Sequence, residues 1–174
     1  MGNEIIVGDW SAWRKCMGVP TNKPQRTTKQ RERYLKPAAL IAFEKEYNDA
    51  QAQKYPHIPP ECRVRTTFRD NTANGLTRAI IAHLQMHGYF AGRVNTTGIY
   101  DHSTGLYRTT SARKGMADIS AVINGRSVQL EIKAGKDRPR TDQMQVQREV
   151  RAAGGVYEFI HNFTEYIELY HRLT

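Results

Sequence analysis

Two stretches of alternating apolar and polar residues, joined by Asn124-Gly125, form the clearest pattern in the chain. Asn-Gly between such stretches is typical of a two-residue hairpin, because both turn residues must tolerate positive φ. If this pair forms the turn, Ile123 lies opposite Arg126, and Asp118 lies opposite Glu131 further along the ladder. Alternation then predicts that one face of the hairpin belongs to the core. That face carries Ile119, Ala121, Ile123, Val128, Leu130 and Ile132.

The opposed carboxylates, Asp118 and Glu131, are an unfavourable pair unless something positive lies between them. Their Cβ atoms would be roughly 5 Å apart, and like charges so placed cost on the order of 0.2–1 kcal/mol. A hard divalent cation would relieve this repulsion, since Mg²⁺ typically takes one or two carboxylates plus waters and substrate phosphates. Alternatively, this polar face is solvated, and its acids pair with Lys133 and nearby arginines. The spacing alone leaves both interpretations open.

Periodic patterns predict further elements on both sides of the hairpin. A helix is expected to start at a cap on Asn71 or Thr72 and to stop at Gly88. The other predicted elements are a strand over 89–94, a helix over 142–153, a strand over 156–160, and a final helix starting at Asn162 or Thr164. The order of helix, strand, hairpin, helix, strand and helix predicts a mixed α/β core.

The first 70 residues follow a different pattern, and we treat 1–70 as a basic N-terminal extension to a domain over 71–174. Trp10 and Trp13 indicate a small apolar anchor, residues 18–30 a polar surface segment, and residues 37–53 a helix with a buried stripe. Beyond three prolines, strand alternation would put Arg63, Arg65 and Arg69 on one side. These arginines are either a phosphate-contacting edge or a solvated face.

Composition narrows the class of partner. The 174 residues allow one domain with a real core, and 26 Lys and Arg against 17 Asp and Glu give a net charge of +9. Such a balance favours a polyanion, with nucleic acid first and an acidic membrane surface second. We expect no signal peptide and no membrane span. The two cysteines cannot form a disulfide framework, which fits a reducing cytoplasm.

Candidate nucleic-acid contacts gather between the first strand and the hairpin. Residues 98–115 are expected to form a long polar loop, and loops of this length are usually functional or disordered. Basic and aromatic side chains there can hold a phosphate backbone and stack on bases. The candidates are Arg93, Tyr100, Tyr107, Arg108, Arg113 and Lys114.

Two histidines offer a weaker alternative site. His83 and His87 are four residues apart on the first predicted helix, which is the spacing of a helical zinc pair. The accompanying glutamate and a clear third ligand are missing. We therefore interpret the pair as a polar flank of an amphipathic helix.

Asp118, Glu131 and Lys133 form the strongest chemical pattern. Metal-assisted phosphodiester hydrolysis needs two acids to anchor a cation, which activates water and neutralises charge on the scissile phosphate. Lys133 shares the face of Glu131, because residues two apart on a strand point the same way. Its ammonium group can orient the water or stabilise developing negative charge.

Residues 116–119 (Met-Ala-Asp-Ile), followed by 131–133 (Glu-Ile-Lys), resemble the PD-(D/E)XK nuclease signature in its VRR-NUC variety. The resemblance extends over about residues 71–172. Supporting segments are residues 72–77 at the start of a helix, 93–98, Gly115, Gln143 and Gln147 after the lysine strand, and 152–156.

The resemblance implies a restriction-endonuclease-like fold, a mixed central sheet flanked by helices. It implies Asp118 and Glu131 as ligands of Mg²⁺ or Mn²⁺, with the Ile132 carbonyl as a third. Lys133 would be the catalytic lysine, and Gln143 a catalytic-site glutamine near the metal or phosphate. The residue pattern by itself also allows Gln143 to be an ordinary surface residue of its helix.

The chain departs from the family pattern at two positions. Ala117 stands where the motif has proline, which carries little chemical weight. Asn74 stands where these nucleases often have a glutamate on the first helix. Asn74 brings no charge, so we expect one well-held cation, and we include Asn74 among the candidate nucleic-acid contacts.

These patterns and the resemblance together predict a metal-dependent endonuclease that cleaves DNA, with branched or structured DNA as substrate, as a Holliday-junction resolvase does. Such a substrate favours a homodimer, and no membrane partner is expected. One alternative is a nucleic-acid-binding module without catalysis, in which the net charge of +9 supplies the binding. Another is a restriction-type enzyme or an RNA nuclease on the same scaffold.

Overall fold

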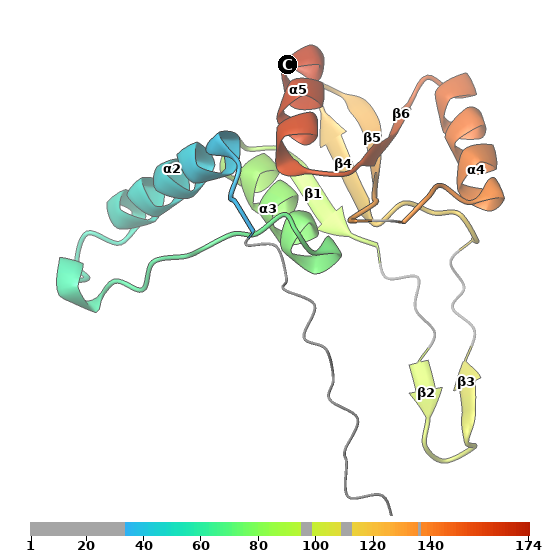
Figure 1. The fold of residues 1–174 in the computed structure, drawn as a ribbon, viewed down its shortest axis with the longest axis horizontal. Helices are drawn as coiled ribbons and strands as arrows, with labels where there is room; N and C mark the ends of the chain where they lie inside the picture. Colours follow the sequence, from blue (N-terminus) through green and yellow to red (C-terminus); the bar gives the residue numbers. More distant parts are fainter. Residues whose placement is uncertain (1–33, 95–98, 109–112, 136) are drawn as a thin grey trace, which may run out of the picture. The chain divides into compact units, whose positions relative to one another are not determined.

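A computed structural model describes residues 34–94, 99–108, 113–135 and 137–174 (Figure 1). The region from Tyr34 to Thr174 forms one compact unit. The expected anchor at Trp10 and Trp13, and the expected polar segment 18–30, lie outside the described residues.

A four-stranded mixed sheet in the order β1-β4-β5-β6 forms the centre of this unit. Its strands are β1 (Phe90–Arg93), β4 (Ile119–Ile123), β5 (Arg126–Ile132) and β6 (Val156–Ile160). The pairs β1–β4 and β4–β5 are antiparallel, and β6 is parallel to β5. Asn124 and Gly125 form the β4–β5 turn with φ of 48° and 76°. Ile123 pairs with Arg126, so the predicted hairpin register is confirmed.

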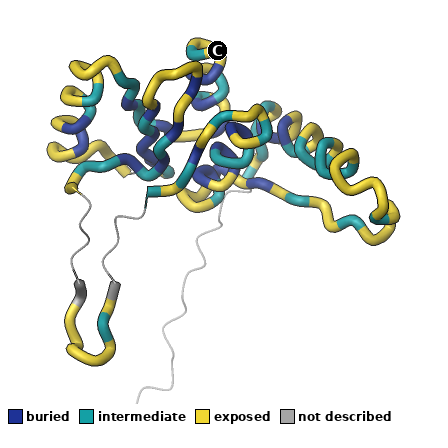
Figure 2. The backbone as a smooth tube through the Cα atoms, turned by 180° about the vertical axis from the view of Figure 1, so that it is seen from behind, coloured by how far each residue is buried: buried dark blue, intermediate teal, exposed yellow. Residues whose placement is uncertain are grey.

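The main core lies between this sheet and three helices. Helices α3 (Ala73–Met86) and α5 (Phe163–Leu173) cover the predicted apolar face of the hairpin, whose side chains are all buried. Helix α2 (Ala38–Lys54) packs on α3 and α5 through Leu40 and Phe43. Residues 34–70 therefore belong to the same compact unit as the sheet. In Figure 2 the buried positions follow the sheet and the helices beside it, while the outer turns of α2 are exposed.

Helix α4 (Thr141–Ala152) covers part of the opposite face of the sheet, so helices flank it on both sides (Figure 1). A second, smaller cluster forms there from Ala117, Val146 and Tyr157. As a consequence, Glu131 and Lys133 are only 5% and 1% exposed. The interpretation of this polar face as solvated is wrong at these two positions, which contact Gln143 on α4 and Asp137 in the loop before it. The pairing of Glu131 with Lys133 that the same interpretation expected is present.

The expected single loop over 98–115 is wrong in part. Strands β2 (Ile99–Asp101) and β3 (Leu106–Arg108) pair into a separate two-stranded sheet. Asp101 shapes the turn between them, because its Oδ1 accepts hydrogen bonds from the backbone N–H and the hydroxyl of Ser103. The strands have three residues each, too few for alternation to be recognised in the sequence. Residues 95–98 and 109–112 lie outside the described part of the chain.

Residues 63–69 form no strand, so the alternation argument for Arg63 and Arg65 does not hold. The backbone of this segment bonds instead to side chains of α2. Asn48 makes two hydrogen bonds to the backbone of Thr66, at 2.8 and 2.9 Å, and Glu44 accepts one from Phe68 at 3.1 Å. A short 3-10 turn, η1 (Pro60–Cys62), precedes the segment. Among the described residues, no helix is both long and apolar enough to cross a membrane.

Candidate active site

The start of β4 and the end of β5 meet at one end of the sheet. The backbone there is held from both sides: Val94 donates to the carbonyl of Asp118 at 2.8 Å, and Lys133 donates to the carbonyl of Ile160 at 2.8 Å. Continuing the β4–β5 register by one pair brings Asp118 opposite Glu131. The two predicted acids therefore share one face at the same end of the sheet.

Asp118 is fixed by a backbone donor from the neighbouring strand. Its Oδ2 accepts a hydrogen bond from the N–H of Ile132 at 3.1 Å. The N–H and C=O of one residue leave a strand toward the same side, so the Ile132 carbonyl is also directed toward the Asp118 side of β5. The Ile132 side chain lies in the main core.

Glu131 is buried and accepts two hydrogen bonds on one oxygen. Oε1 accepts from Gln143 Nε2 at 2.5 Å and lies 3.1 Å from the ammonium of Lys133. Burial raises the pKa of the Glu131 carboxyl above its ordinary value, and the charge of Asp118 raises it further. The nearby Lys133 acts in the opposite direction but does not cancel these effects.

Lys133 has a fully buried side chain with two acidic partners. Its Nζ lies 3.1 Å from Glu131 and 3.1 Å from Oδ2 of Asp137, in the loop before α4. The hydrogen bond from Lys133 holds the pKa of Asp137 below its usual range. Asp137 was not predicted from the sequence, because no motif marks its position in this loop.

Gln143 is a buried part of the site rather than a surface residue of α4. Its amide oxygen accepts from the backbone N–H of Arg140 at 2.9 Å, while its amide nitrogen donates to Glu131. One side chain therefore holds the first turn of α4 and positions the carboxyl group of Glu131. This pair of contacts explains why an amide is suited to this place.

Tyr157 is a second site residue that sequence reasoning missed. It is buried on β6, and its hydroxyl donates to the carbonyl of Gly115 at 3.0 Å. Burial, together with the charges of Glu131 and Asp118, raises the pKa of the Tyr157 hydroxyl far above its usual value. Tyrosine is common in core strands, so the sequence carries no signal that distinguishes this one.

The carboxyl groups of Asp118 and Glu131 each keep one oxygen available. Within the described part of the chain, Asp118 Oδ1 and Glu131 Oε2 have no hydrogen-bond or ion-pair partner. No three His, Cys, Asp or Glu side chains cluster as a metal site among these residues. Two carboxylates and one carbonyl still fit the oxygen ligands of Mg²⁺, which keeps several waters and takes substrate phosphate oxygens.

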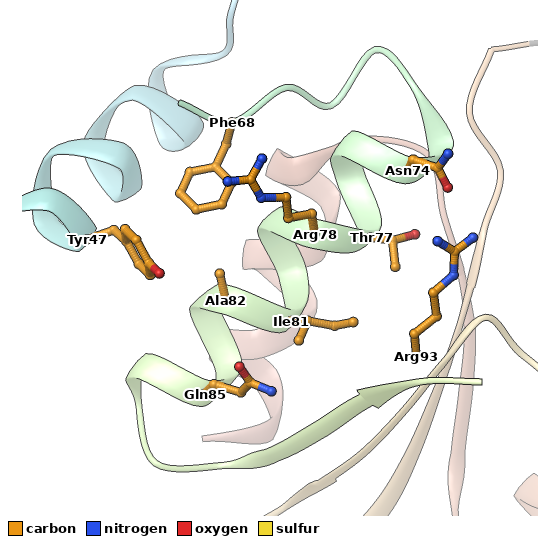
Figure 3. Close-up of a pocket in the computed structure, with 9 residues that line it drawn as sticks. All are labelled: Tyr47, Phe68, Asn74, Thr77, Arg78, Ile81, Ala82, Gln85 and Arg93. Carbon is orange, nitrogen blue, oxygen red and sulfur yellow. The ribbon is translucent and has the colours of Figure 1, made fainter. Parts of the chain in front are cut away.

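Asn74 and Arg93 are the predicted nucleic-acid contacts that the fold brings together. Asn74 lies in the first turn of α3, and Arg93 extends from the end of β1 on the same side as Asn74 and Thr77 (Figure 3). Both are exposed, and both line one pocket. Arg93 is opposite Ile119 in the β1–β4 ladder, one position from Asp118.

The remaining predicted contacts are distributed more widely. Arg113 makes a bidentate pair with Glu149 on α4, at 2.5 and 2.8 Å, and this pairing raises the pKa of its guanidinium. Lys114 is exposed beside it. Arg108 contributes backbone to β3, and its side chain is not described.

Arg63 and Arg65 belong to a different region of the fold. The Arg63 Nε donates to the carbonyl of Ile58 at 2.7 Å, and Arg65 is exposed. Both line a pocket against α2 that includes none of the residues of the candidate active site.

In comparisons with known proteins, no family model and no curated protein matches this chain.

Proposed function

We propose that this chain is a divalent-metal-dependent endonuclease of the restriction-endonuclease-like fold, which hydrolyses phosphodiester bonds in DNA. One observation carries the proposal: Asp118 and Glu131 face each other, each with one oxygen held by the protein and one without a described partner. A buried lysine lies on the same face. The mixed sheet, with α3 before it and α4 connecting its parallel strands, supports the fold assignment.

The residues of the site have distinct roles in this proposal. Asp118, Glu131 and the Ile132 carbonyl would hold Mg²⁺, with Mn²⁺ as a substitute, and the ion would activate water and neutralise charge on the phosphate. Gln143 and Lys133 fix the Glu131 carboxyl group. In this role the Lys133 ammonium would stabilise negative charge that develops on the phosphate.

The substrate class follows from charge and from the family resemblance. A net charge of +9 supplies general attraction to a polyanion. The resemblance adds branched or structured DNA and a homodimer with two active sites, since small single-domain nucleases of this kind act on such substrates. This last step is an analogy with the family.

A substrate panel tests the proposal. The purified full chain is incubated with forked, flapped, linear duplex and single-stranded DNA, and with single-stranded RNA, in Mg²⁺, Mn²⁺ or EDTA. We expect cleavage of at least one substrate with either metal and none in EDTA. Binding without cleavage under every metal condition would show a nucleic-acid-binding module instead, and cleavage of RNA alone would assign the other substrate class.

A further inference from the structure

A pocket of about 360 Å³ opens between α2, α3 and the end of β1 (Figure 3). Its floor is apolar, and polar groups surround the floor. Phe68 is buried, Ile81 and Tyr47 are half-buried, and Asn74, Arg78 and Arg93 are exposed. The pocket plays no part in the metal site proposed above.

The charged side chains that line this pocket are positive. Among the described residues, Arg78 and Arg93 are the only charged ones that line it, and neither has a carboxylate partner there. Elsewhere, Arg113 and Arg151 are paired with glutamates. The two guanidinium groups have no acidic partner and lie beside an apolar pocket floor. This combination favours an anionic ligand that also carries a flat apolar part.

Arg78 and Phe68 already show the geometry that an aromatic ligand would use. The Arg78 guanidinium lies 5.5 Å from the centre of the Phe68 ring, within the range of a cation–π contact. A guanidinium plane and aromatic rings both stack on nucleobases in complexes with unpaired strands. A sugar phosphate attached to that base would meet the arginines.

The volume of the pocket allows an unpaired nucleotide to bind but excludes a base that is still within a duplex. Small-molecule pockets range from about 300 to 1,000 Å³, so this one takes a single base with its sugar phosphate. A base within a duplex is stacked on both sides and paired on its edge. It can enter a pocket only after it has left the stack.

The pocket lies at the end of the sheet that holds the acids. Arg93 lines the pocket, and the next residue, Val94, donates a hydrogen bond to the carbonyl of Asp118 at 2.8 Å. Asp118 in turn contacts the end of β5 through Ile132. Arg93 is paired with Ile119 and lies on the α3 face of the sheet, whereas Asp118 points to the α4 face. A strand that passes over this end of the sheet, from one face to the other, can contact both places.

We propose that this pocket binds an unpaired nucleotide of the substrate strand next to the cleaved bond, and so selects nucleic acid with a branch or single-stranded arm. This inference rests on the proposed nuclease function, and it explains how the nuclease would select its substrate. Arg78 and Arg93 bind phosphate, and the nucleobase lies against the apolar floor of the pocket and Tyr47.

Fluorescence anisotropy with two labelled DNAs tests this inference. The full chain with Asp118→Asn, which prevents cleavage, is titrated with a forked duplex and with a linear duplex of equal length. We expect about tenfold tighter binding of the fork, the size of one base–aromatic stack. Arg78→Glu should reduce this preference to less than about threefold.

Arg126→Glu is the matched control, because Arg126 is an exposed arginine at the start of β5, at the opposite end of the hairpin from Asp118. The same change of charge there should weaken binding to both DNAs and leave the fork preference intact. Since Arg78 is exposed, we expect Arg78→Glu to fold, and circular dichroism checks this. Arg78→Lys, which keeps the charge but loses the planar group, should fall between wild type and Arg78→Glu.

The outcomes separate the two proposals. No fork preference, or equal preference in the Arg78→Glu and Arg126→Glu proteins, overturns the pocket assignment and leaves the nuclease proposal standing. A fork preference that depends on Arg78, combined with no cleavage by the wild-type chain in any metal, supports the pocket and overturns the nuclease.

Discussion

At the residue scale, the carboxyl group of Glu131 determines how the stability of the metal-free protein depends on pH. Its pKa is raised, first by burial and then by the charge of Asp118. An acid whose pKa is higher in the folded than in the unfolded state contributes stability below its unfolded pKa of 4.5. That contribution is lost as pH rises through the folded pKa. At neutral pH the metal-free site is therefore destabilising, and a bound cation would remove this cost.

Replacing Asp118 with Asn should stabilise the metal-free protein. The amide oxygen of Asn can still accept from the N–H of Ile132, while the repulsion on Glu131 disappears. We expect the free energy of unfolding in EDTA at pH 7 to rise by about 0.5 kcal/mol. Urea unfolding measures it, with and without Mg²⁺. Mg²⁺ should stabilise the wild type and not the variant, and a variant less stable than wild type in EDTA would contradict this account.

Gln143 provides the second test at this scale. Gln143→Ala removes the donor that holds Glu131 and leaves the metal-binding oxygens in place. Loss of such a supporting contact typically reduces metal affinity or activity about 10–100-fold, so the Mg²⁺ concentration for half-maximal cleavage should rise by about tenfold or more. Gln145→Ala is the control, an exposed glutamine two residues away on α4 whose contact is to Glu149. Equal effects of both changes would exclude a role for Gln143 at the metal.

At the scale of the elements, the periodicity of apolar residues predicted the long, regular helices and strands. The hairpin, its turn and its register follow from Asn124-Gly125 and strict alternation. Helices α3, α4 and α5 and strands β1 and β6 lie within two residues of their expected bounds. Segment 63–69 could not be predicted, because its backbone partners are side chains of α2, a contact that no local pattern records.

The candidate site was predictable only in part, for the same reason. Asp118, Glu131 and Lys133 follow from two adjacent strands with a known register. Asp137 reaches Lys133 from a loop, and Tyr157 on β6 bonds to the carbonyl of Gly115 before β4, so both depend on tertiary packing. His83 was interpreted as a polar flank, yet it is 5% exposed and bonded to Tyr166. That interpretation is wrong because α5 covers this side of α3.

Gly115 tests how closely the loop before β4 must approach α4. Its φ is +85°, and a Cβ there would lie 2.5 Å from the carbonyl oxygen of Asp142. Gly154 has φ +83° with nothing within 4 Å, so Gly154→Ala should cost only the backbone strain, about 1 kcal/mol. Gly115→Ala should cost about 1–3 kcal/mol more. Urea unfolding compares the two, and equal losses would mean that the close approach is unimportant.

At the scale of the whole molecule, the packing of α3 on α5 makes stability dependent on pH. Burial lowers the pKa of His83 from 6.5 to about 3, with smaller effects from His87 and His171. A histidine kept neutral in the folded state contributes stability that is present above its unfolded pKa. This stability is lost as pH falls from 6.5 toward 3, by about 1.4 kcal/mol per pH unit.

His83→Gln should flatten this dependence. Glutamine can still bond to the Tyr166 hydroxyl but does not titrate. Between pH 6.5 and 4.5 we expect the variant to lose about 1–3 kcal/mol less unfolding free energy than wild type. Urea unfolding across this pH range measures the unfolding free energy of both proteins. Subtracting one from the other removes the contributions of groups that titrate in both. Parallel curves for the two proteins would show that His83 is not held neutral.

In the proposed nuclease, Asp118 and Lys133 act together on a phosphodiester bond. The most direct test is cleavage of a labelled forked DNA by the wild-type chain, Asp118→Asn, Lys133→Met and the remote Arg126→Gln control, in Mg²⁺ and in EDTA. We predict Mg²⁺-dependent cleavage by wild type and control, with at least about a 100-fold loss in either site variant. Cleavage that persists in Asp118→Asn, or in EDTA, would contradict the metal site.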